Sequence, residues 1–407
     1  MALTLFQNAT LFDGISPESP DGISVLVEGE FIKEVSDTPI TAANANVIDC
    51  AGKTLMPGMI DAHIHVYIAS AQLHYPSAPK TYVAHYGAQF MRHALACGFT
   101  TLRDVAGGDH GLAMALRDGF LTGPRFFYGG LAMSQTGGHG DLRSPDIPTD
   151  FCACGAEHQG FTILADGVDE CRKVAREELR KGAHHIKIMG SGGVLSPSDP
   201  LEYPQYSEGE IRAIVEECER QGKYTAAHCH PDEAIKRCLE YGVRSIEHGT
   251  LITDETAALA VEKQAFVVPT MATIYALQEL GPQQGIPDVS MQKLYAVIDK
   301  AMTGLEVMKR AGVQIGFGTD LLGDMHTRQC TEFTIRREAL QPIDILRSAT
   351  SVNARLLGQE DRLGCIKPGA FADILVVDGN PLDDIELLAR NGEKLAVIMA
   401  NGELIKY

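Results

Sequence analysis

Five short runs rich in β-forming residues each end in a side chain that can bind a metal ion or react. The first run, DAHIHV, contains His63 and His65, two residues apart. Alternate side chains of a strand share a face, so both imidazoles would point the same way and one ion could take both. Imidazole and carboxylate are ligands that zinc and similar divalent ions accept readily. The runs therefore predict a two-metal hydrolytic site, to which the other four contribute Lys187 in HHIKIMG, His228 in TAAHCH, His248 in SIEHG and Asp320 in GFGTD.

The middle of the chain has the alternation of strands and helices that could position these residues. Eight β-rich runs, from MIDAHIHV to VQIGFGTD, are separated by stretches such as 169–183 and 208–222, whose apolar residues recur at helical spacing. Gly182 and Gly222 are expected to end two of the helices. Eight strand-then-helix units favour an α/β fold with a parallel (β/α)8 barrel of the TIM type. In such barrels the carboxyl ends of the strands form the active site, and the candidate residues fall at those ends.

The two ends of the chain have a different pattern. Residues 1–56 contain short alternating stretches with turn signals, and residues 361–407 resume that pattern. Because chain ends of a compact domain often lie close together, the two segments are expected to form one small composite β domain. The barrel would then comprise residues 57–360.

Composition limits the classes of partner. The 407 residues include 35 Lys plus Arg against 53 Asp plus Glu, so the formal charge is −18, which disfavours binding to nucleic acid. No apolar run approaches the length of a membrane span, and no secretory signal is recognisable, so a cytoplasmic protein without a membrane partner is expected. The ten cysteines form no paired CxxC pattern and are expected to be reduced thiols.

With these residues in place, the chain resembles the binuclear subtype of the amidohydrolase superfamily over nearly its whole length. The resemblance implies a distorted barrel joined to a composite β-sandwich. It also implies two divalent metal ions, with zinc as the expected metal, bridged by a hydroxide. The first ion would be bound by His63 and His65 with Asp320, and the second by His228 and His248.

Lys187 is the least expected of these residues. It lies between Ile186 and Ile188, so strand parity directs it into the barrel if the isoleucines pack outward. A buried ammonium beside a metal ion would be costly. By resemblance, Lys187 is expected to carry CO2 as a carbamate that bridges both ions. The alternative is a structural lysine paired with a carboxylate.

The resemblance also implies the catalytic roles. Asp320 is expected to accept the proton of the attacking water and to pass it to the leaving amine; alternatively, an Asp at the end of a strand caps a helix. The segments LAMSQTGGHGD and IKIMGSGGVLSPSD are similar to those of prolidase-like dipeptidases and related amide hydrolases. They imply that His139 polarises the substrate carbonyl or stabilises the oxyanion, the alternative being a loop histidine with a local hydrogen bond.

His230 departs from the subgroup pattern, in which a tyrosine often stands two residues after the ligand of the fifth strand. Some relatives that cleave aryl-acyl amino acids have histidine there, and either side chain can donate a hydrogen bond to a substrate carboxylate. The alternative is a histidine that supports the site or lies at the surface. Separately, Arg103 in TTLRD is expected to anchor an ion pair inside the barrel.

The leading hypothesis is hydrolysis of the C–N amide bond of a dipeptide or of an N-acyl amino acid, aryl-acyl groups included. The nearest alternative keeps the site and changes the substrate to a xenobiotic aryl amide, urea or lactam. A third is a catalytically silent scaffold on the same fold, although such a protein should have lost some of the six ligand positions. A small molecule is thus the expected partner, and assembly into a homo-oligomer is compatible with the sequence.

Overall fold

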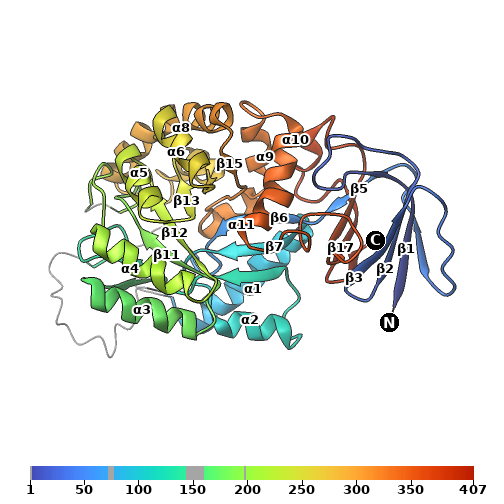
Figure 1. Cartoon of the computed structure of the whole chain (residues 1–407), viewed down its shortest axis with the longest axis horizontal. Coiled ribbons are helices and arrows are strands. Elements are labelled where there is room, and N and C mark those ends of the chain that lie inside the picture. The colour runs from blue at the N-terminus through green and yellow to red at the C-terminus, as the bar shows by residue number, and fades with distance from the viewer. Residues whose placement is uncertain (1, 72–77, 144–159, 197–198) are drawn as a thin grey trace.

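The computed structural model describes residues 2–71, 78–143, 160–196 and 199–407. Parallel strands surrounded by helices make up the larger part of a mixed α/β fold, and strands from both ends of the chain form a sheet at one end of the molecule (Figure 1).

The parallel strands fall into two sheets. The order is β6-β7-β8 in the smaller and β10-β9-β11-β12-β13-β14-β15 in the larger. Each of the eight expected runs contains at least one of these strands. The bounds are Met59–Ile64 (β6), Phe99–Asp104 (β7), Arg125–Tyr128 (β8), Ala132–Ser134 (β9), Thr162–Leu164 (β10), His185–Met189 (β11), Tyr224–Cys229 (β12), Ser245–His248 (β13), Phe266–Val268 (β14) and Gln314–Ile315 (β15).

Backbone hydrogen bonds join the two parallel sheets at both ends. The amide of Ala62 in β6 donates to the carbonyl of Phe317, just after β15, at 2.8 Å. The amide of His184, just before β11, donates to the carbonyl of Tyr128 at the end of β8, also at 2.8 Å. The first and last runs of the barrel-like region therefore lie side by side.

The third run, PRFFYGGLAM, forms two strands rather than one. Gly129 and Gly130 separate β8 from β9, and β9 pairs with β11 of the larger sheet. Gly130 has φ of 73°, and a Cβ there would lie 2.1 Å from Oε2 of Glu178. That carboxylate accepts a hydrogen bond from the amide of Leu131 at 3.1 Å. The break thus requires glycine for both its backbone conformation and its close approach to Glu178.

Helices follow most of the strands. α3 and α4 are followed by Gly182 and Gly222, both at positive φ, as their sequences predicted. Their apolar faces share a core with Ile186 and Ile188 of β11. The helices are Lys80–Ala96 (α1), His110–Arg117 (α2), Val168–Arg180 (α3), Glu208–Glu219 (α4), Asp232–Glu240 (α5), Asp254–Glu262 (α6), Met271–Leu280 (α7), Asp288–Ala311 (α8), Thr331–Arg336 (α9), Pro342–Arg347 (α10) and Asn353–Leu356 (α11).

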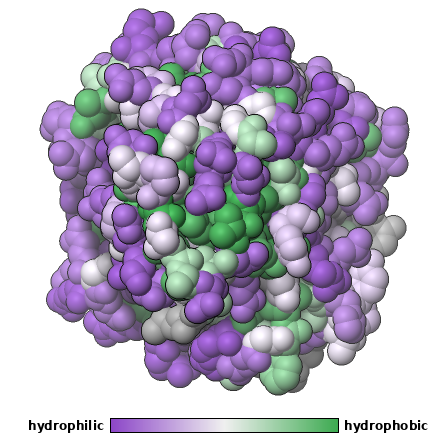
Figure 2. Space-filling model, turned by 90° about the vertical axis from the view of Figure 1, so that its right-hand side faces the viewer, coloured by the Kyte–Doolittle hydropathy of each residue, from purple (hydrophilic) through white to green (hydrophobic). Residues whose placement is uncertain are grey.

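The remaining eight strands form one sheet from both ends of the chain. Its order is β18-β17-β16-β5-β1-β2-β3, with β4 paired to β1. Antiparallel pairing of β16 with β5 joins the two ends. Figure 2 views this end of the molecule, where hydrophobic residues gather near the centre of a largely hydrophilic face. The strands are Leu3–Leu11 (β1), Ile23–Glu28 (β2), Phe31–Ser36 (β3), Asn46–Asp49 (β4), Thr54–Pro57 (β5), Ile374–Val377 (β16), Leu395–Ala400 (β17) and Glu403–Lys406 (β18).

Two further expectations concern cysteines and membranes. All eight cysteines that the structure describes are buried free thiols, while Cys152 and Cys154 lie outside the described residues. Among the described residues, none of the helices combines the length and apolar character that crossing a bilayer requires.

Candidate active site

One pocket lies at the carboxyl ends of the parallel strands, and all eight predicted site residues line it. The six expected ligand positions come from five different strand ends, and His139 and His230 lie beside them. Much of the remaining wall is apolar. The predicted residues in the wall are His63, His65, His139, Lys187, His228, His230, His248 and Asp320, and the larger apolar residues are Ile68, Phe161, Met189, Val194, Leu195, Ile274, Leu277, Leu294 and Leu322.

The first group of metal-binding side chains comprises His63, His65 and Asp320. Their donor atoms all lie within 4.8 Å of one another. Oδ1 of Asp320 is 3.0 Å from Nε2 of His65 and 3.4 Å from Nε2 of His63. Nδ1 of His65 contacts the carbonyl of Ala106 at 3.1 Å, which directs Nε2 toward the group. These three residues form the donor set expected for one ion.

The second group comprises His228, His230 and His248, again with donor atoms within 4.8 Å. Nδ1 of His230 contacts Oγ1 of Thr250 at 2.8 Å, and Nδ1 of His248 contacts Oγ1 of Thr270 at 2.7 Å. The rings of His230 and His248 are stacked with centroids 4.8 Å apart. His230, expected to face substrate, therefore lies among the predicted metal ligands.

The two groups are adjacent. Oδ2 of Asp320 lies 4.0 Å from Nδ1 of His248, and the ring centroids of His63 and His248 are 5.0 Å apart. Lys187 lines the same pocket at 2% exposure, and it forms no ion pair within the described part of the chain. Burial is the main cause that lowers the pKa of Lys187 to about 8. The amine is thus far easier to neutralise than a surface lysine.

The electrostatics of the groups fit divalent cations. Burial holds the pKa of His228 and of His248 well below the usual value, so both rings are neutral near pH 7. Burial raises the pKa of Asp320, but the charges and hydrogen bonds of His63 and His65 outweigh it and keep that pKa well below its usual range. Neutral imidazoles and an ionised carboxylate are the protonation states that metal ligation needs. Each group contains three side chains of the types that bind divalent ions, so the residues present fit two ions.

His248 and Asp320 both have left-handed backbone conformations, with φ of 69° and 53°. Such values are uncommon for residues other than glycine and concentrate at functional sites. The effect is visible in β13: Glu247 is fully buried against Arg103 and His63, yet the next residue, His248, lines the pocket beside His63. Strand parity alone would have turned one of the two away.

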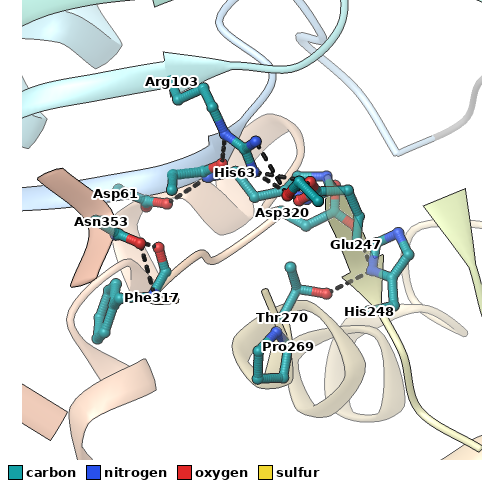
Figure 3. A network of polar contacts seen from close by, with 12 residues as sticks. Asp61, His63, Arg103, Glu247, His248, Pro269, Thr270, Phe317, Asp320 and Asn353 are labelled. Carbon is teal, nitrogen blue, oxygen red and sulfur yellow. Dashed lines mark hydrogen bonds and ion pairs between the residues drawn. The ribbon is translucent and has the colours of Figure 1, made fainter. Parts of the chain in front are cut away.

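A buried ion pair supports the first group (Figure 3). Both oxygens of Glu247 accept from Nη2 of Arg103 at 2.8 Å. Oε2 of Glu247 also lies 2.7 Å from Nδ1 of His63. The expectation that Arg103 anchors a buried ion pair is confirmed. Sequence reasoning missed Glu247, although an acidic residue at an inward position of the strand, next to a candidate ligand, was a usable signal.

Asp61 and Asn353 connect the first and last runs beneath this group. Asp61 accepts from Oγ1 of Thr319 at 2.7 Å and from the amide of His63 at 3.1 Å. The side-chain amide of Asn353 donates to the carbonyls of Ile60 and Phe317, each at 2.8 Å. These contacts hold the backbone that leads to His63 and the backbone that leads to Asp320.

His139 packs beside the second group. Its ring is stacked on that of His228 with centroids 4.4 Å apart, and its Nδ1 lies 3.4 Å from Oδ2 of Asp199. Its amide donates to the side chain of Gln205 at 2.9 Å. The ring is thus held from two sides at the wall of the pocket.

Comparison with known proteins shows the family of this chain. The model of the amidohydrolase family matches residues 54–405. Ochratoxinase from Aspergillus niger is 32% identical over 364 residues, which cover 86% of this chain and 75% of that protein. A solved amidohydrolase structure is 46% identical, with a TM-score of 0.97 over 100% of this chain and 99% of the other. A prolidase solved in complex with N-methylphosphonate-L-proline is 42% identical, with a TM-score of 0.96 over 100% of both chains. The larger part of the fold is thus TIM-barrel-like.

Proposed function

The chain belongs to the amidohydrolase family and is a hydrolase of C–N amide bonds, and we propose that it uses two metal ions to cleave a dipeptide or an N-acyl amino acid, aryl-acyl groups included. The observation that carries this proposal is the pair of adjacent three-donor groups in one pocket. The similarity to a prolidase that binds a phosphonate derivative of proline supports an amino acid as the leaving group.

We assign the two ions to the two groups. His63 and His65 with Asp320 would hold one ion, and His228 with His248 the other. Zinc is the metal that this donor set suits. When bound, two such ions lower the pKa of a water and polarise the scissile carbonyl.

Lys187 would reach both ions as a carbamate. The pKa of about 8 supports this assignment, because a neutral amine adds CO2 and an ammonium does not. An unmodified ammonium would repel both ions, whereas a carbamate supplies the anion that the all-histidine group lacks.

The remaining steps belong to side chains of the protein. Asp320 would accept the proton of the attacking water and deliver it to the leaving nitrogen. His139 would donate a hydrogen bond to the substrate carbonyl oxygen, on which negative charge develops. His230 would donate to the carboxylate of the leaving amino acid.

The proposal extends to the architecture. Residues 57–360 would form one closed, distorted (β/α)8 barrel, which the hydrogen bond from the amide of Ala62 to the carbonyl of Phe317 supports. Residues 1–56 and 361–407 would form a β-sandwich around their shared apolar core. The buried free thiols support a reducing compartment such as the cytoplasm. Assembly into a homo-oligomer stays a prediction.

Metal analysis tests the site. Protein purified without chelator should contain about two ions per chain by mass spectrometry. A Lys187→Ala substitution should lower that number, whereas Lys173→Ala, on an exposed face of α3, should leave it unchanged. A single ion that is insensitive to Lys187→Ala would contradict the binuclear assignment, and no ion at all would favour a silent scaffold.

A substrate panel tests the chemistry. Dipeptides and N-acyl amino acids should be hydrolysed faster than uncharged aryl amides of equal size. The apolar wall, which includes Phe161, Leu277 and Leu294, favours one second candidate, a xenobiotic aryl amide, urea or lactam. Turnover of the uncharged aryl amides alone would replace the first substrate class by the second.

A further inference from the structure

The metal-binding histidines differ in what their second ring nitrogen contacts. In the second group, Nδ1 of His230 and of His248 contacts threonine hydroxyls. Nε2 of His228 lies 3.2 Å from the carbonyl of Gly192. In the first group, His65 likewise contacts a carbonyl. Among these five histidines, only His63 has a second ring nitrogen that is hydrogen-bonded to a carboxylate, that of Glu247 at 2.7 Å.

The carboxylate of Glu247 is fully buried and faces the guanidinium of Arg103, whose Nη2 donates to both of its oxygens at 2.8 Å. A buried carboxylate in this ion pair is ionised. Arg103 and Glu247 are both at 0% exposure, and Oγ of Ser245 donates to Oε1 of Glu247 at 2.6 Å. Four hydrogen bonds thus hold this carboxylate in one orientation.

This arrangement fixes the tautomer of His63. An ionised carboxylate only accepts hydrogen bonds, so Nδ1 of His63 must carry the proton. Nε2 then presents its lone pair on the side of Asp320, 3.4 Å away. A carboxylate at the far nitrogen also makes the imidazole a stronger donor than a hydroxyl or carbonyl does.

We propose that Glu247, held by Arg103, is a positioning residue that makes the two metal positions unequal, so that the ion of the His63 group binds more tightly than the ion of the all-histidine group. This inference rests on the two-metal function proposed above. The negative charge of Asp320 adds to the same asymmetry, because the second group consists of histidines only. A carbamate on Lys187 would serve both positions and would not cancel the difference.

Zinc binding by the whole protein tests the inference without any substrate. Metal-free protein is dialysed against zinc buffers of increasing free concentration, and bound zinc is measured by mass spectrometry. The wild type should bind two ions in two separate steps. Glu247→Gln should bring the steps together by weakening the tighter one about 10- to 100-fold.

The matched control is Glu332→Gln. Glu332 is also at 0% exposure and pairs with a fully buried arginine, Arg336, at 2.6 Å, but it contacts no predicted ligand. The Glu332→Gln substitution should lower the free energy of unfolding, as loss of a buried charge does. Both zinc-binding steps should stay at their wild-type concentrations. A merged pair of steps in Glu332→Gln as well as in Glu247→Gln would overturn the inference.

Thr270→Val provides an independent arm if Glu247→Gln does not fold. It removes the hydroxyl that orients His248, so it should weaken the looser step and widen the interval between the two. Narrowing of that interval would overturn the inference. Equal affinities of the two zinc steps in the wild type would also overturn the inference. If such a protein still hydrolyses amide substrates, the proposed function stands and only the inequality of the two metal positions is wrong. Failure to bind zinc at all would instead defeat the proposed function.

Discussion

His230 occupies a position where two roles compete. Its donor atom lies within 4.8 Å of those of His228 and His248, yet His228 and His248 are the residues assigned to the second ion. The contact between Nδ1 of His230 and Thr250 directs Nε2 away from that hydroxyl and toward the pocket. In the proposed assignment, His228 and His248 hold the second ion, which would leave Nε2 of His230 to bind a substrate carboxylate.

We therefore expect His230→Ala to raise KM about 10- to 100-fold for an N-acyl amino acid, because a hydrogen bond to a charged group contributes about 1.5–3 kcal/mol. The metal content should stay at about two ions per chain. Steady-state kinetics on the acid and on the corresponding amide, which lacks the carboxylate, separates this effect from general damage. The KM for the amide should change little. Loss of one ion per chain would make His230 a metal ligand instead.

At the scale of residues, the sequence predicted the direction of a side chain wherever the strand geometry is regular. Lys187 lies inside the barrel-like region because Ile186 and Ile188 pack outward, as their alternation indicated. His248 and Asp320 are different, because each has a positive φ that no local pattern announces. Their types and positions at strand ends identified them, but the backbone turn that points them inward depends on contacts distant in sequence.

At the scale of elements, the site depends on how β6 meets the chain after β15. That junction is closed by Asn353, which follows a π-helical segment, Ser348–Val352. Its side chain donates to the carbonyls of Ile60 and Phe317 and accepts from the amide of Phe317 at 3.1 Å. His63 and Asp320 each lie three residues beyond these two contact points. Asn353 thus determines the spacing between the two chains that carry them.

Replacing Asn353 by alanine should lower the free energy of unfolding by about 2–4 kcal/mol, because it leaves buried backbone groups without partners. Chemical denaturation of the metal-free protein measures this loss. Asn46→Ala, in the exposed strand β4, serves as control and should change stability by less than about 0.5 kcal/mol. A wild-type denaturation curve for Asn353→Ala would mean that the backbone contacts alone hold the junction.

The split of the third run shows which elements the sequence did not predict. PRFFYGGLAM has the composition of one strand, and the sequence predicted it as one run. The chain breaks between β8 and β9 at Gly130, where Glu178, from α3, approaches the backbone too closely for any side chain. A contact between residues 48 positions apart is invisible to a pattern read along the chain. The alternation of strands and helices was predictable from the pattern, whereas the break within the third run was not.

At the scale of the whole molecule, the terminal sheet and the barrel-like region share a core. One buried cluster contains Met56, Leu375 and Leu395 of the terminal strands together with Phe90 of α1 and Phe99 of β7. Neither part can expose its share of this cluster to water without losing apolar burial. The junction therefore resembles the interior of one domain more than an interface between two.

An ion pair and an aromatic contact reinforce this junction. Nε of Arg125, in β8, donates to Oδ2 of Asp373 at 2.8 Å, and its guanidinium lies 3.8 Å from the ring centroid of Phe371. Asp373, just before β16, also accepts from the amide of Asn401 at 2.7 Å. One carboxylate therefore connects the barrel-like region with the start of β16 and with the turn between β17 and β18.

We expect the two parts to unfold together, in one calorimetric transition, because separating them would expose the shared core. Asp373→Asn should lower the melting temperature, since it leaves the largely buried cation of Arg125 without its counter-charge, at a cost of about 1–3 kcal/mol. The transition should nevertheless stay single, because the apolar core is untouched. Asp378→Asn, an exposed acid at the end of β16, should leave the melting temperature unchanged. Two resolved transitions in the wild type would show that the sheet from the chain ends folds independently of the active site, and the shared cluster would then be a docking contact between separate domains.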